Sequence, residues 1–231
     1  MRANLQRILE HFDNLDDLKV EHGFWPMRWW RVDDFLPEGL FNSVIQQMSL
    51  LEPQDFTVFE NDTSRRLECR YPKHAPIVHG LLLAMNSNRF VDWIQKQSGI
   101  NGLIPDPFYK GGGVCKVERG SRLHLHTDFN WNNDLRLNRQ VNAILYVNET
   151  WESWWNGDLE FWDENKDSPD FVIKPKPNRL VFWEYAPDLV HGFPKQLNCP
   201  EGVSRDTLVT FYYNSNATWE HEPRRSQFKE D

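Results

Sequence analysis

Two places in the chain combine a histidine and an aspartate at the spacing His-x-Asp, which can bring an imidazole and a carboxylate to one metal ion. The pairs are His11 with Asp13 and His126 with Asp128. Residues i and i+2 point to the same face of an extended strand, whereas they diverge on a helix. The first pair lies in a helix-like stretch and the second in a β-rich region, so we expect only His126 and Asp128 to share a metal.

A third ligand is needed to complete such a site, and His191 is the candidate. It follows the apolar run from Leu180 to Trp183 and a short turn, and it precedes Gly192. Two histidines and one carboxylate occupy one face of an octahedral Fe(II) and leave the opposite positions for a cosubstrate and O2. A lone histidine in such a setting is more often structural, so the assignment of His191 depends on the residues around it.

The other histidines are interpreted from their context. His124 alternates onto the same face as His126 and could support the metal ligands, although a structural role is favoured. The remaining four fall outside the β-rich segments and are interpreted as ordinary polar residues: His22, His74, His79 and His221.

Arg205, 14 residues after His191, opens a predicted strand and could bind a carboxylate. A guanidinium can hold a carboxylate through two parallel charge-assisted hydrogen bonds, each contributing roughly 1.5–3 kcal/mol. Thr207 would add a hydroxyl on the same face. The alternative for Arg205 is an ion pair at the protein surface.

The elements that must position these residues change in kind along the chain. The first hundred residues are mainly helical, with helices expected at 36–51, at 77–85 and from about 88 to 99, and with strands around 56–59 and 65–71. After the turn at 111–113, short β-rich runs predominate, at 114–117, 141–147, 158–162, 171–173, 180–185 and 208–213.

This order predicts a mostly β protein with N-terminal helices, in which a sandwich or jelly roll carries the site. The expected division is a helical N-terminal region over residues 1–105, a β core over 106–219 and a mobile tail over 220–231, all within one domain. The tail is expected to be mobile because it is mostly charged or polar and has no apolar period.

Composition narrows the class of function. The chain has 231 residues and a formal net charge of -8, which argues against binding to nucleic acids or anionic membranes. No stretch approaches the ~18 apolar residues of a membrane span. The three cysteines form no CxxC pair and are interpreted as reduced thiols, so a cytoplasmic enzyme or binding module is expected; the oligomeric state cannot be inferred.

Four stretches taken in order resemble the Fe(II)/2-oxoglutarate oxygenase superfamily and, within it, the prolyl 4-hydroxylase-like branch. They are GGGVCKVERGSRLHLHTDFN, NRQVNAILYVNETWESWWNGDLEFWD, NRLVFWEYAPDLVHGF and RDTLVTFYYN. The similarity runs from about residue 90 to 214. The resemblance implies a double-stranded β-helix, which is a cupin-like jelly roll, flanked by helices.

The resemblance also implies roles for individual residues. The family's metal ligands fall on His126, Asp128 and His191, and its carboxylate clamp falls on Arg205. Two further candidates for the cosubstrate are Tyr146, which could equally be an inward-facing aromatic of the barrel, and Lys116, which stands ten residues before His126 where some members have a tyrosine. The implied cofactors are Fe(II), 2-oxoglutarate and O2, with ascorbate as an optional addition.

The expected activity is therefore hydroxylation of an organic substrate, with a prolyl residue in a peptide or protein as one candidate. The alternatives are the same chemistry on a small metabolite or sugar, and a non-catalytic cupin-like metal-binding module. The expected substrate-contact regions are the segment 129–139 and the loop 150–156, which contains Trp151, Trp154 and Trp155. Lys116 and the long interval between His191 and Arg205 depart from the branch and weaken the case for proline.

Overall fold

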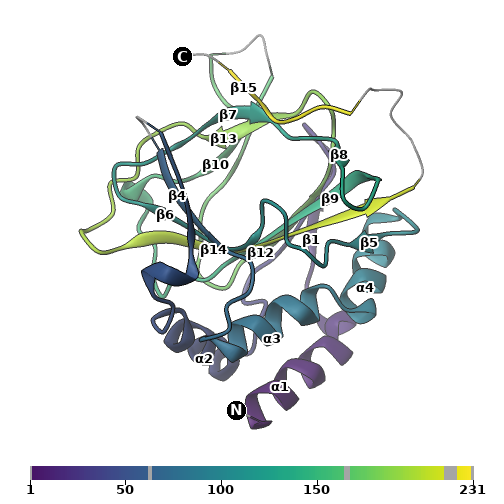
Figure 1. Cartoon of the computed structure of the whole chain (residues 1–231). Helices are drawn as coiled ribbons and strands as arrows, with labels where there is room; N and C mark the ends of the chain where they lie inside the picture. Colours follow the sequence, from purple (N-terminus) through teal and green to yellow (C-terminus); the bar gives the residue numbers. More distant parts are fainter. Residues whose placement is uncertain (1, 62–63, 164–166, 216–222, 230–231) are drawn as a thin grey trace.

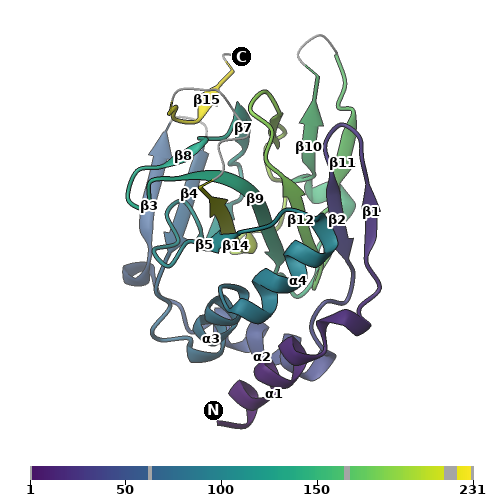
Figure 2. The same cartoon turned by 90° about the vertical axis from the view of Figure 1, so that its right-hand side faces the viewer.

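Two antiparallel sheets face each other, and helices cover the outer side of the larger sheet (Figures 1 and 2). This computed structural model describes residues 2–61, 64–163, 167–215 and 223–229. The larger sheet has the order β1-β2-β12-β9-β14-β6-β4-β3, and the smaller one has the order β11-β10-β13-β7-β15.

The strands of the larger sheet come from both halves of the chain. They are β1 (Glu21–Gly23), β2 (Trp29–Val32), β3 (Thr57–Asn61), β4 (Ser64–Cys69), β6 (Gly113–Glu118), β9 (Leu137–Tyr146), β12 (Leu180–Glu184) and β14 (Ser204–Asn214). Two short strands, β5 (Ile104–Pro105) and β8 (Trp131–Asn132), pair with β14 and β9. The smaller sheet consists of β7 (Leu123–Thr127), β10 (Leu159–Trp162), β11 (Phe171–Ile173), β13 (Val190–Phe193) and β15 (Gln227–Phe228).

The helices match the predicted pattern of apolar residues. They are α1 (Arg2–Asp13), α2 (Glu38–Met48), α3 (Pro76–Met85) and α4 (Asn88–Ser98), with short 3-10 turns at Leu15–Asp17, Pro53–Asp55 and Ser153–Trp155. Helix α4 ends where Gly99 adopts a left-handed conformation, with φ of 71°, which glycine tolerates without steric cost. None of the described helices is long and apolar enough to cross a membrane.

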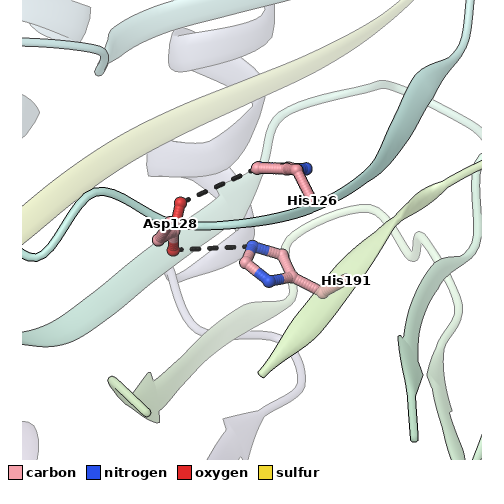
Figure 3. A group of neighbouring side chains, drawn as sticks. All are labelled: His126, Asp128 and His191. Atoms are coloured by element: carbon pink, nitrogen blue, oxygen red, sulfur yellow. Dashed lines mark ion pairs between the residues drawn. The ribbon is translucent and has the colours of Figure 1, made fainter. Parts of the chain in front are cut away.

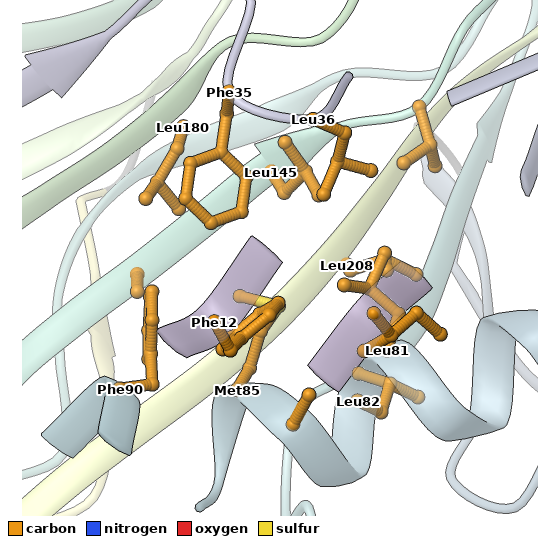
Figure 4. Packing of buried hydrophobic residues seen from close by; sticks show 14 of the residues in the cluster. Phe12, Phe35, Leu36, Leu81, Leu82, Met85, Phe90, Leu145, Leu180 and Leu208 are labelled. Atoms are coloured by element: carbon orange, nitrogen blue, oxygen red, sulfur yellow. The ribbon is translucent and has the colours of Figure 1, made fainter. Parts of the chain in front are cut away.

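The main hydrophobic core lies between these helices and the outer face of the larger sheet (Figure 4). Leu145 of β9 and Leu208 of β14 are register partners, and both point into this core. Full burial of a leucine side chain stabilises the fold by about 1.5–3 kcal/mol. Because side chains alternate along a strand, the neighbouring residues Tyr146 and Thr207 must point inward, toward the smaller sheet. Helix packing thus fixes which residues face the site.

Two parts of the predicted division differ from the structure. Residues 1–105 do more than cover the core with helices, because β2 pairs with β12 and β4 pairs with β6. Since one sheet contains strands from both regions, we propose that they fold as a single domain. Residues 223–229, here called the C-terminal segment, contain the short strand β15, which pairs with β7 and which the sequence did not predict. The mobility of the tail stays a prediction, and residues 220–222 and 230–231 lie outside the described residues.

Candidate metal and cosubstrate site

His126, Asp128 and His191 converge between the two sheets, and each is buried (Figure 3). One ligand atom from each lies within 4.8 Å of the others. His126 Nε2 is 3.8 Å from Asp128 Oδ1, and His191 Nε2 is 3.5 Å from Asp128 Oδ2. Within the described part of the chain, this is the one group of three or more His, Cys, Asp or Glu side chains with a geometry that could hold a metal ion.

Both imidazoles are oriented by the backbone. Nδ1 of His126 lies 2.9 Å from the carbonyl oxygen of His124, and Nδ1 of His191 lies 3.2 Å from that of Leu189. A carbonyl can only accept, so each Nδ1 carries the proton and each Nε2 presents a lone pair toward Asp128. His124 therefore contributes its carbonyl group to the orientation of His126.

The two histidines face each other because β13 approaches β7 closely. His191 and His126 are register partners across the sheet. A Cβ atom added at Gly192 would stand 2.7 Å from the carbonyl oxygens of both Leu123 and His124, a distance that real Cβ atoms do not tolerate. Gly192 thus permits the close pairing that brings the two imidazoles to one point.

A buried network holds the Asp128 carboxylate. Asn142 Nδ2 donates to Asp128 Oδ2 at 3.0 Å, and Arg139 Nη2 lies 3.1 Å from the same oxygen. Arg139 Nε in turn donates to Asn142 Oδ1 at 2.5 Å. Burial raises the pKa of Asp128, but the charge of Arg139, the two imidazoles and the Asn142 hydrogen bond together lower it below its ordinary value, so the carboxylate is ionised.

The surroundings of the triad are aromatic and exclude water. Phe228 of the C-terminal segment stacks on His126 with ring centroids 5.0 Å apart, and Phe161 stacks on His191 at 5.7 Å. Burial, assisted by the neighbouring imidazole of His191, lowers the pKa of His126 to about 4. At neutral pH His126 is therefore uncharged, which is the form that binds a metal.

Arg205 is buried on the inner face of the larger sheet, in β14, opposite the smaller sheet that carries the two histidines. Its Nε donates to the carbonyl oxygen of Gly157 at 2.9 Å, and its Nη2 donates to the Tyr146 hydroxyl at 3.0 Å. The guanidinium also lies 4.6 Å from the ring centre of Phe193, which follows His191 by two residues in β13. No carboxylate lies within ion-pair distance of Arg205 among the described residues, and the carboxylate of Asp158 acts on it only from farther away.

Tyr146 is positioned to assist Arg205. Its side chain is buried, and burial raises the pKa of the phenol, with the charge of Arg205 acting in the opposite direction. The hydroxyl therefore keeps its proton and can donate it in a hydrogen bond to an anion. Thr207 is the register partner of Tyr146 and shares the inward face, but its own hydroxyl makes only a long contact of 3.5 Å with the carbonyl oxygen of Cys115.

Lys116 is not brought to this face. It is the register partner of Asp206, and its ammonium group pairs with the Asp206 carboxylate at 3.2 Å and lies over the ring of Phe56. Arg205 and Thr207, on either side of Asp206, point the opposite way. We therefore leave Lys116 out of the cosubstrate site.

The second His-x-Asp copy does not converge. His11 packs at the end of α1 with its ring 5.0 Å from that of Phe35, while Asp13 turns outward and pairs with Arg89 at 3.1 Å. The helical setting separates the two side chains, as the sequence predicted.

The two predicted substrate-contact regions differ in their surroundings. Phe129 lines a cavity beside the triad. In the other region, Trp151 and Trp155 pack edge to face within a hydrophobic cluster, and only Trp154 is largely exposed, at 65%. Most of the tryptophan-rich loop therefore stabilises the fold.

Sequence reasoning did not assign Asn142 or Phe228 to the site, and it included Arg139 only as the end of the predicted substrate-contact segment 129–139. Asn142 could have been found, because it has the same strand parity as Tyr146 and is a polar residue inside an apolar run. Phe228 gave no such signal, since it lies in a polar stretch without periodicity.

The residues present fit Fe(II) and 2-oxoglutarate. Two imidazoles with free Nε2 lone pairs and one ionised carboxylate form the facial donor set that Fe(II) takes in oxygenases. The buried guanidinium of Arg205, with the adjacent Tyr146 hydroxyl, has the donors that a carboxylate requires. The inner faces of the two sheets thus carry a candidate site for each group.

Comparisons with known proteins agree with this geometry. Residues 112–214 match the 2OG-Fe(II) oxygenase superfamily. A prolyl-4-hydroxylase from Pseudomonas putida has a similar structure, with a TM-score of 0.57 and 18% identity over 90% of this chain and 100% of that one. A Trichoplax adhaerens prolyl hydroxylase in complex with a hypoxia inducible factor peptide fragment has a TM-score of 0.53 and 15% identity over 93% and 91% of the two chains. HygX from Streptomyces hygroscopicus, with nickel and 2-oxoglutarate bound, has a TM-score of 0.53 and 13% identity over 81% and 83%.

At such low identity these structures establish the fold, which confirms the predicted double-stranded β-helix with flanking helices. A search of curated proteins found no match. The segment that matches the 2OG-Fe(II) oxygenase superfamily, residues 112–214, contains the strands that carry the triad and Arg205. This match supports the predicted dioxygenase of the hydroxylating class, dependent on Fe(II) and 2-oxoglutarate.

Proposed function

We propose that His126, Asp128 and His191 hold one Fe(II), that Arg205 and Tyr146 hold 2-oxoglutarate, and that the enzyme hydroxylates a prolyl residue in a peptide. The observation that carries the proposal is the pairing of a buried His-Asp-His group with a buried arginine that makes no direct ion pair with any described residue. Arg205 contacts Phe193, two positions along β13 from His191. Two strand positions span roughly 7 Å, a separation that a five-carbon dicarboxylate can bridge.

The protein residues bind, orient and exclude water. Arg205 neutralises the distal carboxylate of the cosubstrate while the Tyr146 hydroxyl donates to it. Asn142 and Arg139 hold Asp128 so that one carboxylate oxygen stays available to the metal. Phe161 and Phe228 keep water from the triad. When bound, Fe(II) and 2-oxoglutarate supply the oxidising chemistry, coupling the reduction of O2 and the decarboxylation of the cosubstrate to oxidation of a substrate C–H bond.

The choice of proline is supported by the fold, which is similar to those of the Pseudomonas and Trichoplax prolyl hydroxylases, and the latter was solved with a peptide fragment. A small-molecule substrate is the second candidate, because HygX, which has a comparable similarity, was also solved with hygromycin B. Both candidates share the iron chemistry and differ in what the cavity beside the triad admits.

The test of the metal and cosubstrate site is anaerobic reconstitution with Fe(II) and 2-oxoglutarate. Chelation of the metal by the cosubstrate is expected to give a weak visible charge-transfer band, which His126→Ala abolishes. His79→Ala, which removes a histidine outside the site, is the matched control and should leave the band intact. Absence of the band from correctly folded wild-type protein would contradict the proposal.

The substrate is tested by O2-dependent succinate release across a panel of proline-containing peptides, their alanine counterparts, free amino acids, sugars and lipid-like acids. Stimulation by proline peptides alone supports the prolyl assignment, and stimulation by small molecules alone supports the second candidate. A visible band without succinate release from any of them would favour a non-catalytic metal-binding module.

A further inference from the structure

A cavity of about 490 Å³ lies between the segment that follows Asp128 and the C-terminal segment. Its volume is within the range of ligand sites, which is roughly 300–1,000 Å³. Aromatic rings and cations line it together: Lys110, Phe129, Trp131, Arg224, Arg225 and Ser226. Neither the metal nor the cosubstrate assignment uses this cavity.

The two segments that form the cavity are each connected to a candidate metal ligand, one along the chain and the other by strand pairing. Phe129 follows Asp128 directly in the chain. The backbone N–H of Phe129 donates to Ser226 Oγ at 3.2 Å, and that of Arg224 donates to Asn130 Oδ1 at 2.8 Å. Beyond Ser226, β15 pairs with β7 next to His126, as Figure 1 shows at the top of the molecule. A group bound in the cavity would therefore lie beside the candidate metal site.

The cavity has more positive than negative charge near it, in a chain whose net charge is -8. Lys110 is neutralised by Asp134 at 3.1 Å. Arg224 Nη1 approaches Asp188 only to 3.8 Å, and the Asp188 side chain is 83% exposed, so this pair is weak. The guanidinium of Arg224 hydrogen-bonds to the Tyr185 side chain, and its buried Nε and Nη2 have no further hydrogen-bond partner within the described part of the chain. Arg225 has no carboxylate partner among the same residues.

We infer that this cavity is a substrate subsite for an oxyanion, a carboxylate or a phosphate, carried by a group that flanks the oxidised carbon. The arginines offer planar donor pairs that match either oxyanion. The rings of Phe129 and Trp131 would pack against the apolar stem of that group. The inference rests on the proposed function and narrows its substrate class to peptides with an acidic residue close to the proline.

The experiment compares three pentapeptide amides in which one proline is followed by two glutamates, two phosphoserines or two glutamines. Their affinities are measured by titration calorimetry with anaerobic protein, with and without Fe(II) and 2-oxoglutarate. At low salt, at least one anionic peptide is expected to bind at least 10-fold more tightly than the glutamine peptide, and the tighter of the two identifies the oxyanion.

Two variants assign this preference to the cavity. Arg225→Ala changes an exposed position, where folding is not at risk. This variant and Arg224→Gln are each expected to reduce the preference for the anionic peptide over the glutamine peptide to below about 3-fold. Lys96→Ala removes a cation that pairs with Asp16 on the far side of the molecule and should leave it unchanged.

Equal affinity for all three peptides, binding of none of them, or a preference unaffected by both arginine variants would overturn the subsite. These outcomes are separable from failure of the iron assignment. A preserved visible band without anion preference refutes the subsite alone, whereas anion preference without a band refutes the metal and cosubstrate assignment alone.

Discussion

The replacement Arg205→Gln tests the cosubstrate clamp because it removes the charge while keeping an amide that can donate a hydrogen bond. In the ligand-free protein Arg205 is a buried cation that donates hydrogen bonds to two neutral acceptors, the Tyr146 hydroxyl and the Gly157 carbonyl oxygen. Its desolvation is not offset by an ion pair. The ligand-free variant is therefore expected to be at least as stable as the wild type.

The effect on 2-oxoglutarate should be large. Loss of two charge-assisted hydrogen bonds, at roughly 1.5–3 kcal/mol each, raises Kd by about 100-fold or more. At a ligand concentration of about 100 times the wild-type Kd, binding stabilises the wild-type protein by ~2.7 kcal/mol, but the variant by only ~0.4 kcal/mol. For a chain of this length these values correspond to shifts in Tm of about 5–10 °C and about 1 °C.

The assay is thermal unfolding with anaerobic Fe(II), with and without 2-oxoglutarate. Arg89→Gln is the matched control, because Arg89 is 65% exposed and pairs with Asp13 far from the site. Its shift on addition of 2-oxoglutarate should equal that of the wild type. A wild-type shift in Arg205→Gln would refute the clamp, and a large loss of ligand-free stability would refute the view of Arg205 as a charge kept for a ligand.

Three further predictions concern other residues. Burial lowers the pKa of His11 from 6.5 to about 4, so as the pH falls the imidazole is protonated in the unfolded chain before it is protonated in the folded one. The free energy of unfolding should therefore fall by about 3 kcal/mol between pH 6.5 and pH 4. Chemical denaturation of His11→Gln should not show this fall, and the same pH dependence in the variant as in the wild type would contradict the prediction. Asn142→Leu should weaken Fe(II) or Ni(II) binding by about 10- to 100-fold in a metal titration, because Asp128 loses its orienting donor; unchanged affinity would show that the network is dispensable. Lys116→Met should leave the affinity for 2-oxoglutarate within 2-fold of the wild type, which is roughly 0.4 kcal/mol. The free energy of unfolding should drop by about 1–3 kcal/mol, because Asp206 is left buried without its cation. A loss of 2-oxoglutarate binding without a loss of stability would show that Lys116 contacts the cosubstrate.

The sequence predicted the elements that have strong periodicity. The helices and the strands around Ile144, Phe182 and Val209 carry apolar runs long enough to identify them. Strand β13 was missed because His191 and Gly192 interrupt its apolar pattern, although that interruption is the functional feature. Short strands such as β2 gain their order from pairing with β12, a tertiary contact that leaves little local signal.

Residues on the inner face of the larger sheet can be predicted once it is known which alternate residues of each strand point inward. Lys116 was assigned to the cosubstrate site without this information. Lys116 was included through its position relative to His126, but the register with β14 places it opposite Asp206 and on the helix side of the sheet. The alternation of side chains along β14 places Arg205 and Asp206 on opposite faces of the sheet. The number of residues between Lys116 and His126 does not say which face Lys116 occupies.

The two His-x-Asp copies show which property defines a metal site here. Burial lowers the pKa of His11 and of His126 to the same value of about 4, so both imidazoles are neutral at pH 7 and both could bind a metal on that criterion. Nε2 of His11 is buried without a hydrogen-bond partner, yet its carboxylate neighbour in sequence, Asp13, has turned to the surface. What distinguishes His126 is the convergence of Asp128 and His191 upon it, which requires an extended backbone and a second strand held close by Gly192. Burial lowers the pKa of a histidine anywhere in the protein. The three candidate ligands come together only where β7 and β13 pair.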